Sequence, residues 1–319
     1  MDNYIKKWFD ILNGMSNDNT YKLAWGRAII ESIVFDEGVM NDSQYRIHFD
    51  TISRHMLKYY WNQCFFFNLK QSSNQEHPPV VVQLTNKLIE YYKKKFSNIP
   101  IWFDKAKSVI EKGVLEDVIH DISTVLKENV SWRFKIIESE TIEIYFLNKK
   151  ERYIELLVED VKSIKAYNEI LTQLFNYKWA QLLEKYNTQP RIVSKIKGSS
   201  DNQLKRNNLS KYKDILLLLY QDEIKDFYTD EPIKPEDISI DHFIPWSYMY
   251  SDDLWNLVIT SKSRNSSKSN RPPTKDYIQK LEERNRKLLE VIQDNNQKEE
   301  LMESLEHHYI TRFYQNLIS

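Results

Sequence analysis

The sequence contains one cysteine, Cys64, and only five glycines among its 319 residues. A single cysteine can form neither an internal disulfide nor a structural zinc cluster, so we expect a reducing compartment and a buried, unreactive Cys64. Tight β-turns usually require glycine, and its scarcity beside many Lys/Glu/Leu-rich runs predicts a mostly helical chain. No apolar run approaches the roughly 18 residues of a membrane span, and residues 1–14 lack the apolar region of a signal peptide. These absences predict a soluble, cytoplasmic protein.

The chain also lacks an excess of charge of either sign. It has 45 Lys+Arg against 46 Asp+Glu, a net charge of −1, so the whole composition does not indicate a nucleic-acid-binding protein. Local clusters matter more, because phosphate contacts are made by patches. Residues 262–275 contain five basic side chains and no acidic one, and residues 191–213 form a second basic cluster. Such runs are usually solvated surface; as candidate phosphate contacts we take Lys262, Arg264, Lys268 and Arg271.

Hydrophobic periodicity divides the chain into two parts. Up to about residue 135 the pattern predicts successive helices, including one over residues 43–67. Alternating apolar residues then predict a small β-hairpin or sheet around residues 135–157, followed by a long helix over 158–186. Residues 198–202 are small and polar, as in linkers. We expect an α+β, predominantly helical protein with a recognition or partner domain at 1–198 and a second domain at 199–319, which ends in one or two helices broken near 294–296.

The segment that carries chemistry begins at an adjacent Asp-His pair. Asp241 and His242 end a short predicted strand, and a proline-containing loop leads to a second strand that begins at Trp255 and Asn256. Asn256 lies fourteen residues after the histidine, Asn265 nine residues further, and Lys268 three beyond that, on a short polar helix. Each residue alone is a weak signal, since isolated Asp, His and Asn residues mostly serve as surface, core or capping groups. Their joint order predicts a strand–loop–strand–helix unit in which the Asp-His pair and Asn265 meet.

This arrangement resembles the HNH endonucleases, which have a ββα-metal fold. The runs DHFIP, DD, NLVIT and NSSKS within residues 241–269 are particularly similar to the HNH domain of RNA-guided CRISPR type II nucleases. Bacterial restriction-like HNH proteins share the same pattern. The resemblance covers about 35 of the 319 residues.

The resemblance implies a role for each matching residue. Asp241 would be a metal ligand, and His242 the general base that takes a proton from the attacking water. Asn256 would hold the loop and the imidazole in place, and Asn265 would be the second protein ligand of the metal. Lys268 would neutralise a phosphate.

The expected chemistry is consistent with these residue types. A phosphodiester is anionic and repels nucleophiles, so its cleavage is helped by a cation that absorbs charge on the phosphoryl and leaving oxygens. A histidine with a pKa near ~6.5 can accept a proton from water at neutral pH. Asp and Asn offer oxygen donors, which favour Mg²⁺ or Mn²⁺ over Zn²⁺.

The sequence departs from the family pattern in two respects. Many HNH proteins flank this core with two CxxC pairs that bind zinc, and this chain has none. Helices around residues 205–225 and 275–317 must therefore support the small unit by packing. The third motif position is Asn265 where the family name has histidine.

We therefore expect a metal-dependent endonuclease that hydrolyses DNA, with a role in bacterial restriction or anti-phage defence by family analogy. A single HNH site cuts one strand, which favours a homodimer or a larger complex. Two alternatives stay open: an RNase or toxin-like nuclease with the same fold, and a non-catalytic nucleic-acid-binding subunit.

Trp246 and Tyr248, beside the catalytic loop, can either stack on nucleic acid or fill the core of the loop.

Overall fold

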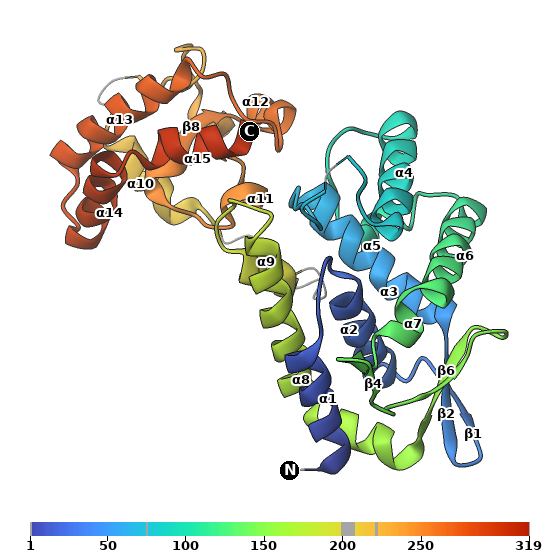
Figure 1. Cartoon of the computed structure of the whole chain (residues 1–319). Helices are drawn as coiled ribbons and strands as arrows, with labels where there is room; N and C mark the ends of the chain where they lie inside the picture. Colours follow the sequence, from blue (N-terminus) through green and yellow to red (C-terminus); the bar gives the residue numbers. More distant parts are fainter. Residues whose placement is uncertain (1, 75, 199–207, 221–222, 319) are drawn as a thin grey trace. The chain divides into compact units, whose positions relative to one another are not determined.

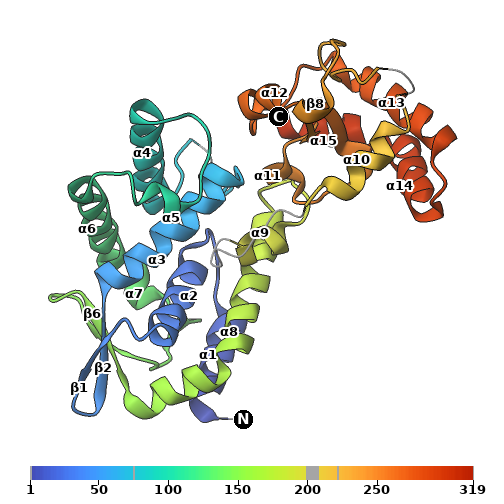
Figure 2. The same ribbon diagram turned by 180° about the vertical axis from the view of Figure 1, so that it is seen from behind.

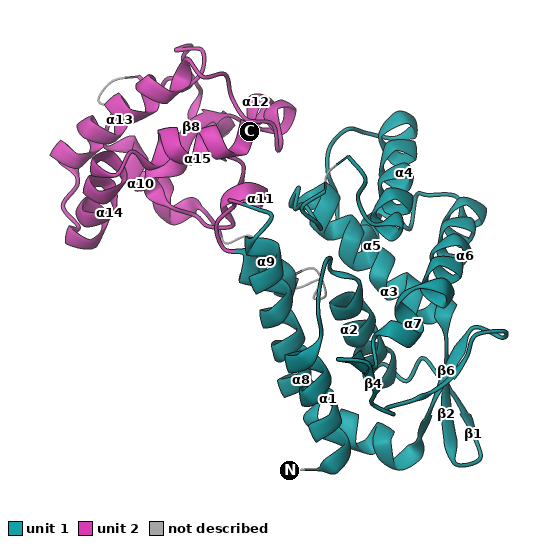
Figure 3. Cartoon of the chain, viewed as in Figure 1, with its two compact units in different colours: residues 1–187, 192–203 teal, residues 188–191, 204–319 magenta. Residues whose placement is uncertain are grey.

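The computed structural model describes residues 2–74, 76–198, 208–220 and 223–318 (Figure 1). The chain divides into two compact units (Figure 3): an N-terminal unit of residues 1–187 and 192–203, and a C-terminal unit of residues 188–191 and 204–319. The predicted linker comprises residues 198–202, of which 199–202 lie outside the described residues. Residue 199, where the second domain was predicted to begin, therefore lies outside them as well. Within the described ranges no helix is both long and apolar enough to cross a membrane.

The N-terminal unit is built mainly from helices (Figures 1 and 2). They are α1 (Asn3–Gly14), α2 (Tyr21–Val34), α3 (Phe49–Trp61), α4 (Val80–Lys95), α5 (Phe103–Ala106), α6 (Lys112–Glu128), α7 (Val130–Arg133), α8 (Val158–Glu184) and α9 (Ile192–Gly198). Helix α2 is central and packs against both α3 and α8. Its approach to α8 requires Gly26, because a Cβ atom there would lie 2.4 Å from the ring of Phe175.

A small antiparallel sheet lies beside these helices, in the order β1-β2-β6-β5. Its strands are β1 (Val39–Asn41), β2 (Gln44–His48), β5 (Phe146–Asn148) and β6 (Tyr153–Leu157), and β3 (Ile136–Ile137) and β4 (Glu140–Thr141) form a separate pair.

The prediction of one helix over residues 43–67 is wrong at its start. Residues 44–48 form β2, and α3 begins only at Phe49. Tyr45 and Ile47 are buried and alternate with more exposed residues, and Ile47 pairs with Ile154 of β6. This period of two matches a half-buried strand, and its partner lies more than a hundred residues away in the sequence.

Helices α2 and α3 share a partly buried charge network. Nε of Arg27 lies 3.0 Å from the Glu31 carboxylate, and the guanidinium lies over the Tyr59 ring. The ring nitrogens of His55 lie 3.3 Å from Glu31 and 2.5 Å from Glu37. Burial alone would lower the pKa of His55, but the hydrogen bonds to both glutamates outweigh burial and raise it to about 9.

The protonated His55 should make the stability of the N-terminal unit depend on pH. Because its folded pKa of about 9 lies above the ordinary 6.5, its contribution is fully present below pH 6.5 and is lost as pH rises through 9. We expect a loss on the order of 1–3 kcal/mol. Urea unfolding at about pH 6 and about pH 10 should show this loss in the wild type and not in His55→Gln. The exposed His77→Gln is the control, and equal pH dependence in all three proteins would contradict the assignment.

The C-terminal unit surrounds a two-stranded antiparallel hairpin with helices. Its elements are α10 (Ser210–Leu217), β7 (Ile238–His242), α11 (Trp246–Met249), β8 (Leu257–Ser261), α12 (Lys262–Lys268), α13 (Tyr277–Val291), α14 (Asn295–Glu306) and α15 (Tyr309–Ile318), with 3₁₀ turns at Pro235–Asp237 and Leu254–Asn256. The second strand thus begins later than predicted, after a 3₁₀ turn that contains Asn256. In the described part of the chain after residue 275 there are three helices, α13, α14 and α15, where one or two were predicted. The additional break lies at His307 and His308, and His308 has a φ of 51°.

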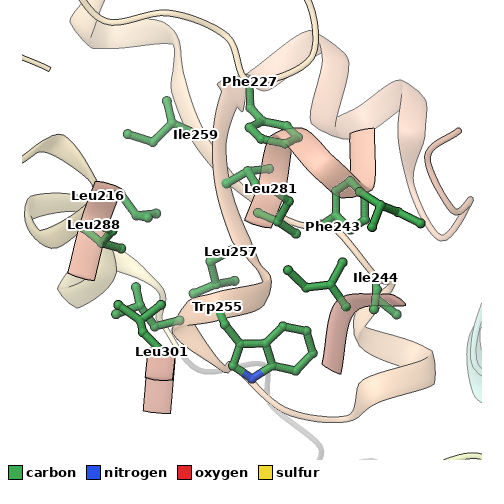
Figure 4. Packing of buried hydrophobic residues seen from close by; sticks show 14 of the residues in the cluster. Leu216, Phe227, Phe243, Ile244, Trp255, Leu257, Ile259, Leu281, Leu288 and Leu301 are labelled. Carbon is green, nitrogen blue, oxygen red and sulfur yellow. The ribbon is translucent and has the colours of Figure 1, made fainter. Parts of the chain in front are cut away.

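The hairpin is supported by a single apolar core (Figure 4). Phe243, Leu257 and Ile259 come from the hairpin and the loop that follows its first strand. They pack with residues of the flanking helices, among them Leu216, Leu281, Leu288, Leu301, Ile310 and Tyr314. Helices that precede and follow the hairpin in the sequence therefore pack against it, which is the support that we expected in the absence of CxxC pairs.

Candidate active site

The hairpin and α12 bring the Asp-His pair and Asn265 to one cavity. Asp241 pairs with Val258 and His242 with Leu257 in the β7–β8 ladder, and α12 packs against both strands. Next to them lies a cavity of about 320 Å³. Its lining consists of Asp241, His242 and Asn265 together with Leu209, Ile240, Pro245, Trp246, Ser266, Ser269 and Asn270.

Asp241 is buried and held by two donors. The hydroxyl of Tyr228 donates to Oδ2 over 2.6 Å, and Nζ of Lys268 lies 3.0 Å from the same oxygen. Neither contact uses Oδ1. The carboxylate is thus fixed through one oxygen while the other is left for a further ligand.

Lys268 lies in the protein interior beside this carboxylate. Its ammonium also donates to the main-chain oxygen of His242 over 2.8 Å, and its side chain is only 10% exposed. Burial lowers the pKa of Lys268, while the neighbouring Asp241 partly opposes that shift. In this structure Lys268 therefore fixes Asp241 and the end of β7. Contact with a phosphate stays a prediction.

His242 faces a second carboxylate. Its Nε2 lies 2.9 Å from Oδ1 of Asp252, and both side chains are 8% exposed. Because an ionised carboxylate can only accept, a neutral imidazole donates from Nε2 and keeps its lone pair on Nδ1. A nitrogen with a free lone pair is what a general base needs.

Asn256 is fully buried and binds the main chain of the loop that follows β7. Its Oδ1 accepts from the Ile244 amide over 2.8 Å, and its Nδ2 donates to the Ile244 carbonyl over 2.9 Å. The main-chain oxygen of Asn256 also accepts from the Phe243 amide. These bonds fix the turn directly after His242, the place where we expected Asn256 to act.

Asn256→Ala should destabilise the C-terminal unit. The change leaves the buried N–H and C=O of Ile244 without partners, at a cost of about 2–4 kcal/mol. Asn256→Asp should also destabilise, because a carboxylate cannot donate to the Ile244 carbonyl. Urea unfolding of the full chain measures both, with the exposed Asn296→Ala as the control. A change of less than about 0.5 kcal/mol in Asn256→Ala would contradict the anchoring role.

The amide of Asn265 is oriented by β7. Its Nδ2 donates to Oγ of Ser239 over 2.7 Å and to the main-chain oxygen of Ile240 over 3.1 Å. A carbonyl can only accept, so the amide nitrogen faces the strand and Oδ1 is turned away from it. Asn265 thus offers an oxygen donor on the same cavity as Asp241.

These donors fit a hard divalent cation. In the described part of the chain no three His, Cys, Asp or Glu side chains are grouped as a metal cluster. One carboxylate oxygen and one amide oxygen, with positions left for water and phosphate, suit Mg²⁺ or Mn²⁺.

The other predicted residues, the basic side chains and the two aromatic rings, differ in how far they are exposed to solvent. Lys262 and Arg271 are exposed, and Nε of Arg264 lies 3.7 Å from the buried Asp226. Trp246 and Tyr248, for which stacking and packing were both open, are 8% and 3% exposed. Both rings therefore belong mainly to the packing of the loop, although Trp246 also borders the cavity.

Sequence reasoning assigned no role to two residues that contact the site. Asp252 belongs to the quoted DD run, and its place ten residues after His242 was the available signal. Tyr228 precedes Asp241 by thirteen residues with no motif between them, and only folding brings its hydroxyl to the carboxylate. Tyr228 is itself fixed, since its amide donates to Asp226 and its carbonyl accepts from Tyr277.

Comparison with known proteins shows which families the chain is similar to. Residues 226–274 match the family model described as HNH endonuclease. The chain is 27% identical over 196 residues to the CRISPR-associated endonuclease Cas9 of Streptococcus mutans, which covers 58% of this chain and 13% of that protein. It is 26% identical over 191 residues to the corresponding protein of Listeria innocua, covering 54% and 13%. The matches thus span only a small part of these relatives. No solved structure matches the chain.

Proposed function

We propose that this chain, whose residues 226–274 form an HNH endonuclease domain, is a metal-dependent enzyme that hydrolyses phosphodiester bonds in DNA. The observation that carries the proposal is the meeting of Asp241, His242 and Asn265 at one cavity. A buried base and two oxygen donors for a cation are the parts that phosphodiester hydrolysis needs.

In the proposed reaction, His242 is the general base. A water oxygen forms a bond to phosphorus while its proton moves to the imidazole, and the bond to the leaving sugar oxygen breaks. The leaving oxygen keeps the electron pair and takes a proton from solvent. Asn256 fixes the loop beside the imidazole, and Tyr228 and Lys268 hold Asp241.

Asp241 and Asn265 would hold Mg²⁺ or Mn²⁺. A cation bound there would withdraw charge from the phosphoryl and leaving oxygens. Its protein ligands would be one oxygen of each side chain.

The exposed basic side chains on α12 and just after it are the proposed contacts to the nucleic-acid backbone. Lys262 and Arg271 are exposed, and Arg264 is 41% exposed at its side chain. DNA as the substrate, and a role in restriction or anti-phage defence, are proposed on the likeness to proteins described as CRISPR-associated endonucleases. Because one HNH site cuts one strand, we further propose a homodimer or a larger complex for double-strand cleavage.

A comparison of substrates tests the proposed function. Labelled duplex DNA, single-stranded DNA and RNA of one sequence are incubated with the full chain in Mg²⁺, Mn²⁺ or EDTA. We expect metal-dependent cleavage of DNA. Cleavage confined to RNA would overturn the substrate assignment. Binding without cleavage of any of the three would indicate a non-catalytic subunit.

A further inference from the structure

We propose that Asp252 is a positioning residue that sets the tautomer and orientation of the His242 imidazole. The inference deepens the proposed nuclease function and rests on it. It starts from the contact between Nε2 of His242 and Oδ1 of Asp252, which is 2.9 Å long and joins two side chains that are each 8% exposed. A charge-assisted hydrogen bond in this setting is strong, because little water competes for either partner.

The loop that carries Asp252 is fixed on both sides of it. Before it, Tyr250 ends α11 in the left-handed conformation, with a φ of 57°, and its amide donates to the Trp246 carbonyl. After it, the Leu254 amide donates to Oε1 of Glu300 on α14 over 2.6 Å. The carboxylate therefore reaches His242 from a loop whose two flanks are anchored.

This contact determines which nitrogen can act as the base. With its proton on Nε2 donated to Asp252, the neutral imidazole keeps its lone pair on Nδ1. When Nδ1 takes the proton from water, the imidazolium that forms remains hydrogen-bonded to the Asp252 carboxylate, which stabilises the new positive charge. Asp252 thus acts through His242, as a positioning residue.

Nuclear magnetic resonance of the histidine rings tests the tautomer directly. Ring ¹⁵N signals are recorded for the wild type, Asp252→Asn and Asp252→Ala, and His242 is identified among the seven histidines by comparison with His242→Gln. We expect the Nε2-protonated form in the wild type and in Asp252→Asn, whose amide oxygen still accepts. In Asp252→Ala we expect a mixture of both tautomers. The wild-type tautomer in pure form in Asp252→Ala would overturn the proposal.

Kinetics provide the second readout. In Asp252→Ala we expect kcat for plasmid nicking to fall about 10–100-fold, while KM and the affinity for Mn²⁺ stay within about twofold. Asp252→Asn should fall between Asp252→Ala and the wild type, because it keeps the acceptor and loses the charge. Asp253→Asn is the matched control: it removes the same charge one residue away, and should keep wild-type kcat. An unchanged kcat in Asp252→Ala would overturn the positioning role.

The two readouts separate this inference from the function on which it rests. If the wild type cleaves no nucleic acid, the proposed function fails. The ring signals still show whether Asp252 sets the His242 tautomer. If the wild type cleaves and the Asp252 variants match it in both readouts, the inference alone fails.

Discussion

Replacing His242 with alanine should lower the rate of nucleic-acid cleavage by about 10²–10⁴-fold, because the attacking water then has no base beside it. Binding should change little, since the His242 side chain is only 8% exposed and does not belong to the exposed basic side chains of residues 262–271. Cleavage of a labelled plasmid measures the first effect. Fluorescence anisotropy with a labelled duplex in EDTA measures the second.

His77→Ala is the control for this experiment. His77 is an exposed histidine of the N-terminal unit, so its removal should leave cleavage and binding at wild-type levels. Cleavage by His242→Ala at more than about a tenth of the wild-type rate would contradict the role assigned to the imidazole. Loss of binding together with cleavage would instead place His242 in substrate binding.

Replacing Asp241 with asparagine should weaken metal binding at least about tenfold and reduce cleavage to a similar or greater extent. The new side chain keeps the shape of the carboxylate but loses the charge that a divalent cation requires. It also leaves the ammonium of Lys268 without its ionic partner. Calorimetric titration with Mn²⁺ measures the affinity without any turnover.

Two further variants distinguish the loss of the Asp241 carboxylate as a ligand from a general change in the charge of the C-terminal unit. Asp237→Asn removes a carboxylate from the 3₁₀ turn before β7 and should leave Mn²⁺ affinity unchanged. Asp241→Asn combined with Lys268→Met removes both charges of the Asp241–Lys268 ion pair, so no unpaired ammonium remains. The double variant still lacks a charged ligand, so metal binding should stay weak. Wild-type affinity in the single Asp241 variant would show that the cation binds elsewhere.

The spacing of the motif predicted the local arrangement around the cavity because its parts are close in sequence. Asp241 and His242 end β7 and pair with Val258 and Leu257 of β8, which leads directly into α12. From this helix Asn265 contacts Ile240 and Lys268 contacts Asp241. Asn265 then needs only one helical turn to reach the cavity. Local turns and adjacent strands of this kind leave few alternative arrangements.

Contacts that depend on distant packing could not be predicted in this way. Tyr228 reaches Asp241 only because the segment before β7 is held by Asp226, which accepts from Thr260 and the Ser261 amide on β8. The strand β2 exists because β6 pairs with it across more than a hundred residues. Periodicity over residues 43–67 carries no information about such a partner, which is why a helix was predicted there.

The helices that pack on the hairpin were likewise predicted only in part from the sequence. The apolar stripe of residues 275–317 predicted helices that pack on the hairpin, and Leu281, Leu288 and Leu301 do so. The break at His307 and His308 was not predicted, because neither glycine nor proline marks it. A positive φ at His308 turns the chain so that α15 can bring Ile310 and Tyr314 onto the same core.

The most direct test of the account is whether metal controls the conversion of supercoiled plasmid to nicked or linear forms. The purified full chain is first treated with EDTA, then supplied with Mg²⁺ or Mn²⁺, with His242→Ala in parallel. We predict no nicking in EDTA, nicking on addition of either metal, and none above background in the variant. Equal nicking in EDTA, or in His242→Ala, would contradict a metal-dependent centre built from Asp241, His242 and Asn265.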